Sequence, residues 1–291
     1  MNIIVTGSLG NVGEPLTSNL VKRGHAVTVI SSSPGRQPAI EALGARAAIG
    51  SLQDADFLTS SFESADAVFA MIPPNVGVDD VIAYYREVGR SYAQAVRDSG
   101  VKRMVHLSSW GAHREAGTGV IVGAHEVEEI LNTLSGVALT HLRAGSFYTN
   151  LYGFTEAIRA QGVIRSNYGG EDKVAWVHPR DIAVAAAEEL EKMNGEHVRY
   201  IVSDERTASS TAHLLGAAIG QPDLEWLRVS DEEARANLLQ SGLPLPTADL
   251  LVDLNASIHS GVMGEDYERR KPVAMGEVKT EDFAEEFAAA F

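Results

Sequence analysis

The stretch "VTGSLGNVG", residues 5–13, places Gly7, Gly10 and Gly13 at intervals of three residues behind an apolar run. The residues that follow, "NVGEPLTSNLVKRG", have a helical pattern. In a strand–turn–helix unit each glycine has a physical reason: a tight turn, close approach of the backbone to a pyrophosphate, and close helix–strand packing. The start of the helix offers unpaired N–H groups to an anion. The stretch therefore predicts a dinucleotide-binding turn rather than a flexible loop.

Short β-rich runs alternate with helical segments in the first half of the chain. The runs occupy residues 2–6, 26–30, 45–50, 65–71, 102–109 and 137–143. Most are apolar for several residues in succession, as is typical of strands covered on both faces. The segment 78–100 has one apolar stripe at helical spacing and ends at Gly100, a suitable helix terminator. The alternation predicts an α/β fold, a doubly wound parallel sheet of the Rossmann type.

The pattern changes after residue 143, where helical segments dominate. We expect an NAD(P)-binding Rossmann domain in residues 1–150 and a smaller, mostly helical substrate lobe in residues 151–291. The segment "VRYIVSD", residues 198–204, has the pattern of one further strand. We expect this strand to return to the sheet, so that the second lobe interleaves with the first.

The charge balance narrows the classes of partner. The chain has 291 residues, with 24 Lys and Arg against 39 Asp and Glu, for a net charge of −15. Such an acidic chain repels phosphate backbones, so nucleic acid is not expected as a partner. The partner expected is a small-molecule acceptor. The sequence allows a homodimer but does not determine the oligomeric state.

Composition also limits the chemistry and the location. Cysteine is absent, which excludes disulfides and thiolate sites, and the nine histidines show no metal-binding spacing, so no metal is expected. No apolar stretch approaches membrane length, so no membrane partner is expected. The N-terminus shows no signal segment, and we expect a soluble, cytoplasmic protein.

The end of the second expected strand decides between the two nicotinamide dinucleotides. NAD-binding proteins usually place Asp or Glu there to bond the ribose 2′-hydroxyl. This chain has no acidic residue between Lys22 and Glu41. Ser31, Ser32 and Arg36 lie there instead, and they can bind a 2′-phosphate. We therefore expect NADP(H) to be preferred over NAD(H).

With these motifs in view, the chain resembles the NmrA-like branch of the atypical short-chain dehydrogenases/reductases, and within it proteins related to type 2 NAD(P)H:quinone oxidoreductase. The resemblance runs from residues 5–13 through "GVKRMVHLSSWGA" (100–112) and "HEVEEILNTLSGVALTHLRAGSFYTNL" (125–151) to "VHPRDIAVAA" (177–186) and the C-terminus. In one departure, Ser51 occupies the Asp position of the family's usual Gly-Asp pair.

The resemblance implies which residues line the cofactor. They lie in the glycine turn, in the loop after the second strand, after the fourth strand, and at the ends of the fifth and sixth strands. The expected residues are Gly7, Leu9, Gly10, Asn11, Val12, Gly13, Ser31, Ser32, Arg36, Met71, Ile72, Pro73, Ser108, Ser109, His125, Gly145, Ser146 and Phe147. Because such sheets bind ligands at the C-terminal ends of their strands, the resemblance and the physical argument agree.

The expected catalytic residues are His125 and Tyr148. Ordinary short-chain dehydrogenases use a Tyr-x-x-x-Lys pair, and the corresponding positions here are Ile121 and His125. Loss of the tyrosine acid/base puts alcohol oxidation and sugar epimerisation in doubt. Relatives of the quinone oxidoreductase type have His at this position and Glu four residues later, as His125 and Glu129 do here. The alternatives are a surface His125–Glu129 pair and a Tyr148 that packs at a strand-to-helix junction.

Two functions from different classes remain open. The first is an NAD(P)H-dependent reductase that transfers hydride to a quinone or a similar conjugated carbonyl. The second is a non-catalytic, NADP-sensing regulatory protein of the NmrA-like kind. An open apolar pocket beside Ser109, Phe147 and Tyr148 would favour the reductase.

Overall fold

The computed structural model describes residues 1–75, 77–272 and 274–291. The chain forms two compact units that alternate along the sequence. The first unit comprises Met1–Ser109, Gly123–Arg143 and Ile182–Arg199, and the second comprises Trp110–Val122, Ala144–Asp181 and Tyr200–Phe291. The chain therefore enters the second unit three times, and each unit is described by itself below.

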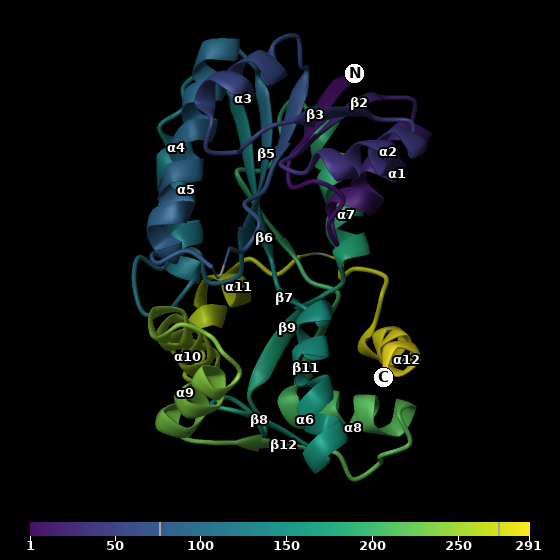
Figure 1. Ribbon diagram of the computed structural model, residues 1–291, viewed down its shortest axis with the longest axis vertical. Helices are drawn as coiled ribbons and strands as arrows, with labels where there is room; N and C mark the ends of the chain where they lie inside the picture. The colour runs from purple at the N-terminus through teal and green to yellow at the C-terminus, as the bar shows by residue number, and fades with distance from the viewer. Residues whose placement is uncertain (76, 273) are drawn as a thin grey trace. The chain divides into compact units, whose positions relative to one another are not determined.

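A seven-stranded sheet forms the centre of the first unit (Figure 1). Its strands are β1 (Asn2–Val5), β2 (Ala26–Ser31), β3 (Arg46–Ile49), β4 (Ala67–Ala70), β5 (Arg103–Ser109), β6 (Ala138–Ala144) and β10 (Val198–Ile201). Their order is β10-β6-β5-β4-β1-β2-β3, and the β1–β2, β1–β4, β2–β3 and β4–β5 pairs are parallel. The predicted doubly wound α/β fold is confirmed. The order reverses between β1 and β4, and open α/β sheets bind ligands at such a switch point.

Helices cover both faces of this sheet. Figure 1 shows α3 (Ala55–Phe62), α4 (Val81–Ser99) and α5 (Ile121–Asn132) on one side, with α1 (Gly13–Lys22), α2 (Gln37–Ala42) and α7 (Pro179–Leu190) on the other. A 3₁₀ turn, η1 (Pro34–Arg36), precedes α2. The two helical layers explain why the strands are apolar on both faces.

Helix α4 shows how the sequence sets an element's ends. The Asp80 carboxylate accepts a hydrogen bond from the Ala83 N–H and caps the first turn, and Gly100 ends the helix in the left-handed conformation. The predicted apolar stripe is buried at Val88, Tyr92 and Val96. The stripe packs into the core that α3, α4 and the sheet share.

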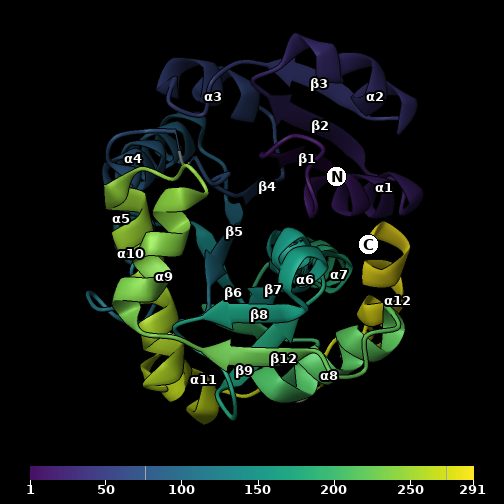
Figure 2. The ribbon, with the colours of Figure 1, turned by 60° about the horizontal axis from the view of Figure 1, so that its bottom comes forward.

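The second unit contains two small sheets and several helices. Strands β7 (Ser146–Phe147), β9 (Lys173–Val177) and β11 (Asp204–Thr207) form one sheet, and β8 (Val163–Ser166) pairs in parallel with β12 (Glu225–Arg228). Figure 2 shows β8 beside β12 and α9 (Asp231–Gln240) beside α10 (Leu245–His259). The remaining elements are η2 (Tyr148–Phe154), α6 (Thr155–Gln161), α8 (Ala208–Ala218), η3 (Val262–Gly264), α11 (Glu265–Arg269) and α12 (Thr280–Ala290).

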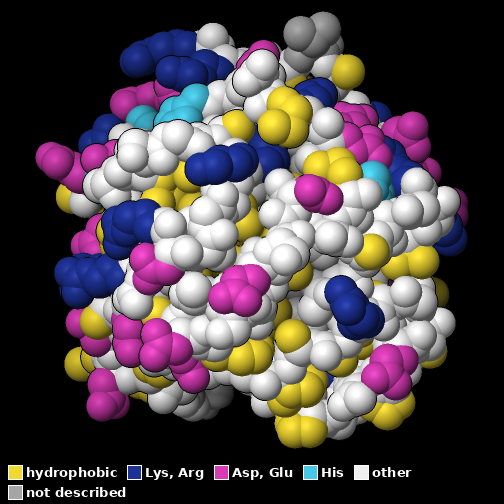
Figure 3. Space-filling view, turned by 90° about the horizontal axis from the view of Figure 1, so that it is seen from above, with side chains coloured by type: hydrophobic (Ala, Val, Ile, Leu, Met, Phe, Trp, Pro, Cys, Tyr) yellow, Lys and Arg dark blue, Asp and Glu magenta, His cyan; other side chains and the backbone are white. Residues whose placement is uncertain are grey.

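The surface carries both signs of charge. Figure 3 shows acidic and basic side chains scattered over the face seen from the top of Figure 1. Across the described part of the chain, no helix combines the length and the apolar character needed to cross a bilayer.

Candidate functional site

The glycine turn joins β1 to α1, and at two of its glycines there is no room for a side chain. Gly7 has a φ of +91°, a conformation that favours glycine, and a Cβ there would overlap the Met71 sulfur. A Cβ on Gly13 would overlap the carbonyl oxygen of Ser8. At Gly10 the nearest atom to a built Cβ is the Gly7 carbonyl oxygen, at 3.6 Å. Gly10 therefore has open space beside it, which is what the approach of a ligand needs.

Serine hydroxyls fix the turn to the loop after β2. The Ser8 hydroxyl donates to Ser31 Oγ at 3.0 Å, and Ser31 Oγ also accepts from the Ser33 N–H at 3.2 Å. Ser31 is buried, so its hydroxyl serves this internal contact. Helix α1 begins after Val12, whose side chain provides no cap. The N-cap residue of α1 therefore supplies no side-chain acceptor to the first turn, an arrangement compatible with an anion at the helix start.

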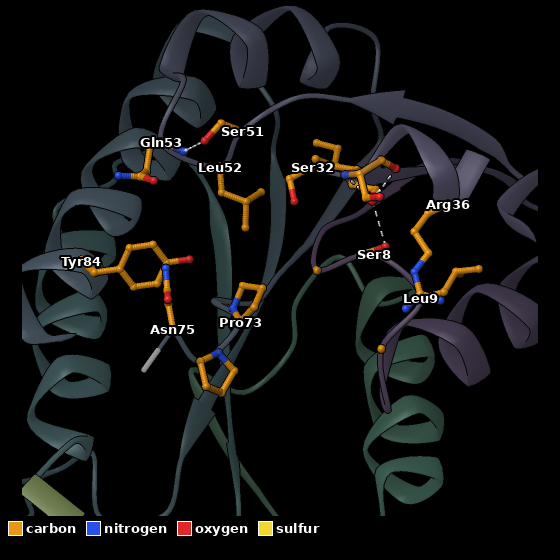
Figure 4. Close-up of a pocket in the computed structure, with 16 residues that line it drawn as sticks. Ser8, Leu9, Ser32, Arg36, Ser51, Leu52, Gln53, Pro73, Asn75 and Tyr84 are labelled. Carbon is orange, nitrogen blue, oxygen red and sulfur yellow. Dashed lines mark hydrogen bonds between the residues drawn. The ribbon is translucent and has the colours of Figure 1, made fainter. Parts of the chain in front are cut away.

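A pocket of about 500 Å³, here called the glycine-turn pocket, lies within the first unit (Figure 4). It is lined by Gly7, Ser8, Leu9, Gly10, Ile30, Ser31, Ser32, Ser33, Arg36, Ser51, Leu52, Gln53, Pro73, Pro74, Asn75 and Tyr84. These described lining residues include Arg36 but no Asp or Glu, although the chain has 39 acidic residues. A pocket with a guanidinium and no carboxylate suits an anion.

The two ends of the pocket differ in character. Figure 4 shows Arg36 beside Leu9 at the glycine turn, with Tyr84 and Asn75 at the opposite end. The glycine turn and a cation thus lie at one end, and the other end combines ring and apolar surfaces with the polar side chains of Ser51, Gln53 and Asn75. This division matches a ligand with a phosphate-bearing part and a flat, apolar part.

A family model described as NAD(P)H-binding matches residues 7–192. The chain belongs to this NAD(P)H-binding family. The matched range begins at the glycine turn and includes every residue that lines the glycine-turn pocket. Membership therefore agrees with the fit of the pocket to a phosphate-bearing ligand.

The similarity of this chain to two characterised relatives extends over most of its length. It is 27% identical over 260 residues to an NAD(P)H azoreductase from Xenophilus azovorans, covering 87% of this chain and 86% of the relative. It is 28% identical to a (4-alkanoyl-5-oxo-2,5-dihydrofuran-3-yl)methyl phosphate reductase from Streptomyces griseus, covering 85% and 83%. The chain is thus similar to NAD(P)H-dependent oxidoreductases.

A solved structure shares the fold of this chain. An NADPH-dependent quinone oxidoreductase from Escherichia coli, solved with NADPH, superposes with a TM-score of 0.84 at 23% identity. The match covers 98% of this chain and 99% of that one. At this identity the likeness shows the fold, and the predicted resemblance to proteins of this type is confirmed.

The expected cofactor residues fall into separate places. Those that line the glycine-turn pocket are Gly7, Leu9, Gly10, Ser31, Ser32, Arg36 and Pro73. Asn11, Val12 and Gly13 lead from the turn into α1 but are not among the lining residues. Ile72 is buried in the hydrophobic core, and the backbone of Met71 is held by Thr6 and Tyr92 beneath the turn. The segment after β4 thus presents its prolines to the pocket.

Ser108 is committed to a buried ion pair. Its hydroxyl donates to Glu128 Oε1, and the Arg143 guanidinium binds both carboxylate oxygens, at 3.0 and 2.6 Å. Ser108 and Glu128 are both buried. The Ser108 proton therefore points to a carboxylate, and this network ties the end of β5 to α5 and β6. Ser109, next along the strand, is partly exposed.

Gly145, Ser146, Phe147 and Tyr148 lie in the second unit. Gly145 faces the backbone of Ala175, whose carbonyl oxygen a Cβ would overlap, and Ser146 and Phe147 form β7. Strand β7 pairs in parallel with β9 in the three-stranded sheet of this unit.

Tyr148 lies inside an aromatic stack. It has no exposed surface, its ring lies 4.9 Å from that of Phe283 and 5.9 Å from that of Trp176, and its hydroxyl bonds Thr280 Oγ1 at 3.0 Å. Burial raises the pKa of the Tyr148 phenol above its usual range. A phenol so enclosed is a packing residue, and this placement does not favour the catalytic role expected for it.

The histidines His125, His106 and His178 lie in three different structural environments. His125 is half-buried on α5 in the first unit. His106 is a buried core residue hydrogen-bonded to His141. His178 accepts a hydrogen bond from the Arg180 N–H at 3.1 Å and so caps the start of α7. Within the described ranges, no group of three His, Cys, Asp or Glu residues is arranged to hold a metal ion.

Sequence reasoning missed the far end of the pocket. Ser51, Leu52 and Gln53 follow β3, Asn75 follows β4, and Tyr84 lies on α4. Tyr84 lies outside the apolar stripe of its helix, and its sequence context does not mark it as a ligand contact. The signal that was available is Ser51, which had been noted as a departure from the family's Gly-Asp pair.

Proposed function

We propose that this protein is an NADPH-dependent reductase that transfers hydride to a quinone or a similar conjugated acceptor. The observation that carries the proposal is the glycine-turn pocket, which has Arg36, no carboxylate among its described lining residues, and an open Gly10. The reductase part rests on the relatives, whose names describe reduction with NAD(P)H or NADPH.

The loop after β2 favours NADPH over NADH. Ser32, Ser33 and Arg36 are exposed and line the pocket, so they are available to bind a 2′-phosphate. Ser31 is turned inward to Ser8 and holds this loop in place. NAD selection needs a carboxylate for the 2′-hydroxyl, and the described lining offers none.

The bound nicotinamide supplies the hydride. The chain has Ile121 where the usual catalytic tyrosine stands, and Tyr148 is enclosed in the second unit. A reaction that needs no strong protein acid suits this arrangement, because a reduced quinone takes its proton from water. The chain then contributes binding and orientation.

We assign His125 to the part of the site that would hold the nicotinamide and its ribose. It stands on α5 three residues before Glu128, which Ser108 and Arg143 fix to the sheet. This anchoring holds the helix turn that carries His125. We favour a role in holding the nicotinamide ribose over a role as proton donor, since a quinone needs little help with protons.

The test is a comparison of cofactors and acceptors in steady state. With a naphthoquinone or an azo dye as acceptor, NADPH should be oxidised with a lower KM than NADH. With NADP⁺ and simple alcohols, no reduction of NADP⁺ should occur, because the tyrosine acid/base is missing. Binding of NADPH with no turnover of any acceptor would favour the NADP-sensing alternative.

A further inference from the structure

The end of the glycine-turn pocket that lies away from Arg36 has flat and apolar walls. Tyr84 and Leu52 are partly buried and line it, and Pro73 and Pro74 add rings without N–H donors. Figure 4 shows the Tyr84 ring pointing from α4 into this end, with Leu52 across from it. Walls of this kind suit a planar heteroaromatic ring, which packs on aromatic and aliphatic faces.

The polar groups at this end are largely engaged with one another. Ser51 Oγ accepts the Gln53 N–H at 3.1 Å, and the Gln53 side-chain amide donates to Glu87 Oε2 at 2.9 Å. The Asn75 side-chain oxygen accepts the Gly77 N–H at 3.2 Å. Glu87, the carboxylate that approaches this rim, is thus held by Gln53 and is not among the lining residues.

What these contacts leave for a ligand are two hydroxyls, an amide nitrogen and an amide oxygen. The Ser51 and Tyr84 hydroxyls can each donate or accept, the Asn75 amide nitrogen donates and the Gln53 amide oxygen accepts. A carboxylate would select a base that carries an amino group, because it only accepts hydrogen bonds. Hydroxyls make no such choice, since they can face an amino group or a carbonyl oxygen equally well.

We propose that this end binds the purine base of the dinucleotide between Tyr84 and Leu52 and does not distinguish a 6-amino from a 6-oxo purine. The inference rests on the proposed binding of NADPH and adds the specificity of its base. A pocket discriminates strongly only where it must pair one specific donor or acceptor, and here two hydroxyls lie with one amide donor and one amide acceptor, so that either purine finds a partner.

The experiment compares two cofactors, NADPH and reduced nicotinamide hypoxanthine dinucleotide phosphate. Calorimetric titration of the wild-type chain should give Kd values within about threefold of each other. In Ser51→Asp the new carboxylate accepts from the amino group and faces the oxo group of the analogue. The ratio of the two Kd values should then rise by about tenfold or more in favour of NADPH.

Two controls separate base recognition from charge and folding. Ser60→Asp adds the same charge on the exposed side of α3, outside the pocket, and should keep the wild-type ratio. Tyr84→Ala should weaken the binding of both cofactors by about tenfold without changing the ratio of their Kd values. Tyr84→Phe should retain most of the affinity for both.

Three results would overturn the inference. One is a wild-type chain that binds NADPH but rejects the hypoxanthine analogue by about tenfold or more. Another is a folded Tyr84→Ala variant with unchanged affinity for both cofactors. In either case the proposed reductase would stand, whereas a wild-type chain that binds neither cofactor would remove both proposals.

Discussion

Gly10 and Gly13 differ in the space around them. Substitutions at these two positions therefore test cofactor binding and folding separately. Gly10 has room for a side chain, so Gly10→Asp should fold normally, yet its carboxylate would block and repel a pyrophosphate. Gly13 has none, so Gly13→Ala should lower the free energy of unfolding by about 1–3 kcal/mol. Urea unfolding and NADPH titration of both variants measure the two effects. Wild-type affinity in Gly10→Asp would mean that the turn is structural only.

Arg36 is predicted to bind the 2′-phosphate. Arg36→Ala should weaken NADPH binding by about 1–3 kcal/mol and leave NADH binding nearly unchanged, because only NADPH carries the phosphate. Arg46→Ala, which removes an exposed arginine outside the pocket, is the matched control for charge. Equal affinities of the wild-type chain for NADPH and NADH would contradict the assignment.

For His125 the two roles predict different behaviour. If His125 holds the ribose, His125→Ala should bind NADPH more weakly and turn over more slowly at every pH. If it donates a proton, His125→Ala should bind NADPH as tightly as the wild-type chain and lose turnover only. Turnover is measured from pH 5 to 9, with Kd determined separately. A variant with unchanged affinity and rate would place His125 outside the site.

Sequence reasoning reaches furthest for residues whose conformation is set by their local neighbours. The geometry of a single strand–turn–helix unit requires glycine at Gly7 and Gly13, and the whole of this unit can be read from one continuous stretch of sequence. Tyr148 and Ser108 do not, because the spacing places them at strand ends without saying whether they face a ligand or the interior. Burial in an aromatic stack and a bond to Glu128 settle that question in the fold. Tyr84 reaches the pocket only because α4 packs beside the β4 loop.

Helices and strands were predictable where they are long or fully buried. The central strands β1, β2, β4, β5 and β6 match apolar runs, and α4 matches its stripe and its glycine stop. Strands β8, β11 and β12 are as short as β1 and β4, but they contain charged residues where β1 and β4 have an apolar run. Their pairing depends on contacts between distant segments. The second unit was therefore predicted as mostly helical, without its two small sheets.

Strands β5 and β6 are linked by a histidine pair that should make the fold sensitive to acid. His106 Nδ1 and His141 Nδ1 lie 3.0 Å apart, and burial, with a neighbouring histidine as the second cause, lowers the pKa of each to about 3. In the unfolded chain both imidazoles titrate near the usual 6.5. The unfolded state thus binds more protons between these values, so stability present above pH 6.5 is lost as pH falls toward 3.

The measurement is the free energy of unfolding in urea from pH 7 to pH 4. His106→Gln removes one titrating group from the pair and should make the loss of stability with acid shallower. His213→Gln, at an exposed histidine, should keep the wild-type slope. An unchanged slope in a folded His106→Gln variant would show that the buried pair does not govern acid stability.

Across the whole chain, a net charge of −15 contrasts with a pocket whose described lining has a cation and no carboxylate. Among the described residues that line this pocket there is no Asp or Glu, although Glu14 stands in the first turn of α1. This contrast, with membership of the NAD(P)H-binding family, ties the fold to a phosphate-bearing nucleotide. The relatives add reduction as the chemistry.

The most direct measurement mixes the chain with NADPH and a naphthoquinone without oxygen and follows both reactants. The account predicts saturable oxidation of NADPH with one hydroquinone formed for each NADPH consumed, and loss of this activity in folded Gly10→Asp. A wild-type chain that binds NADPH but oxidises none with any quinone or azo acceptor would contradict it.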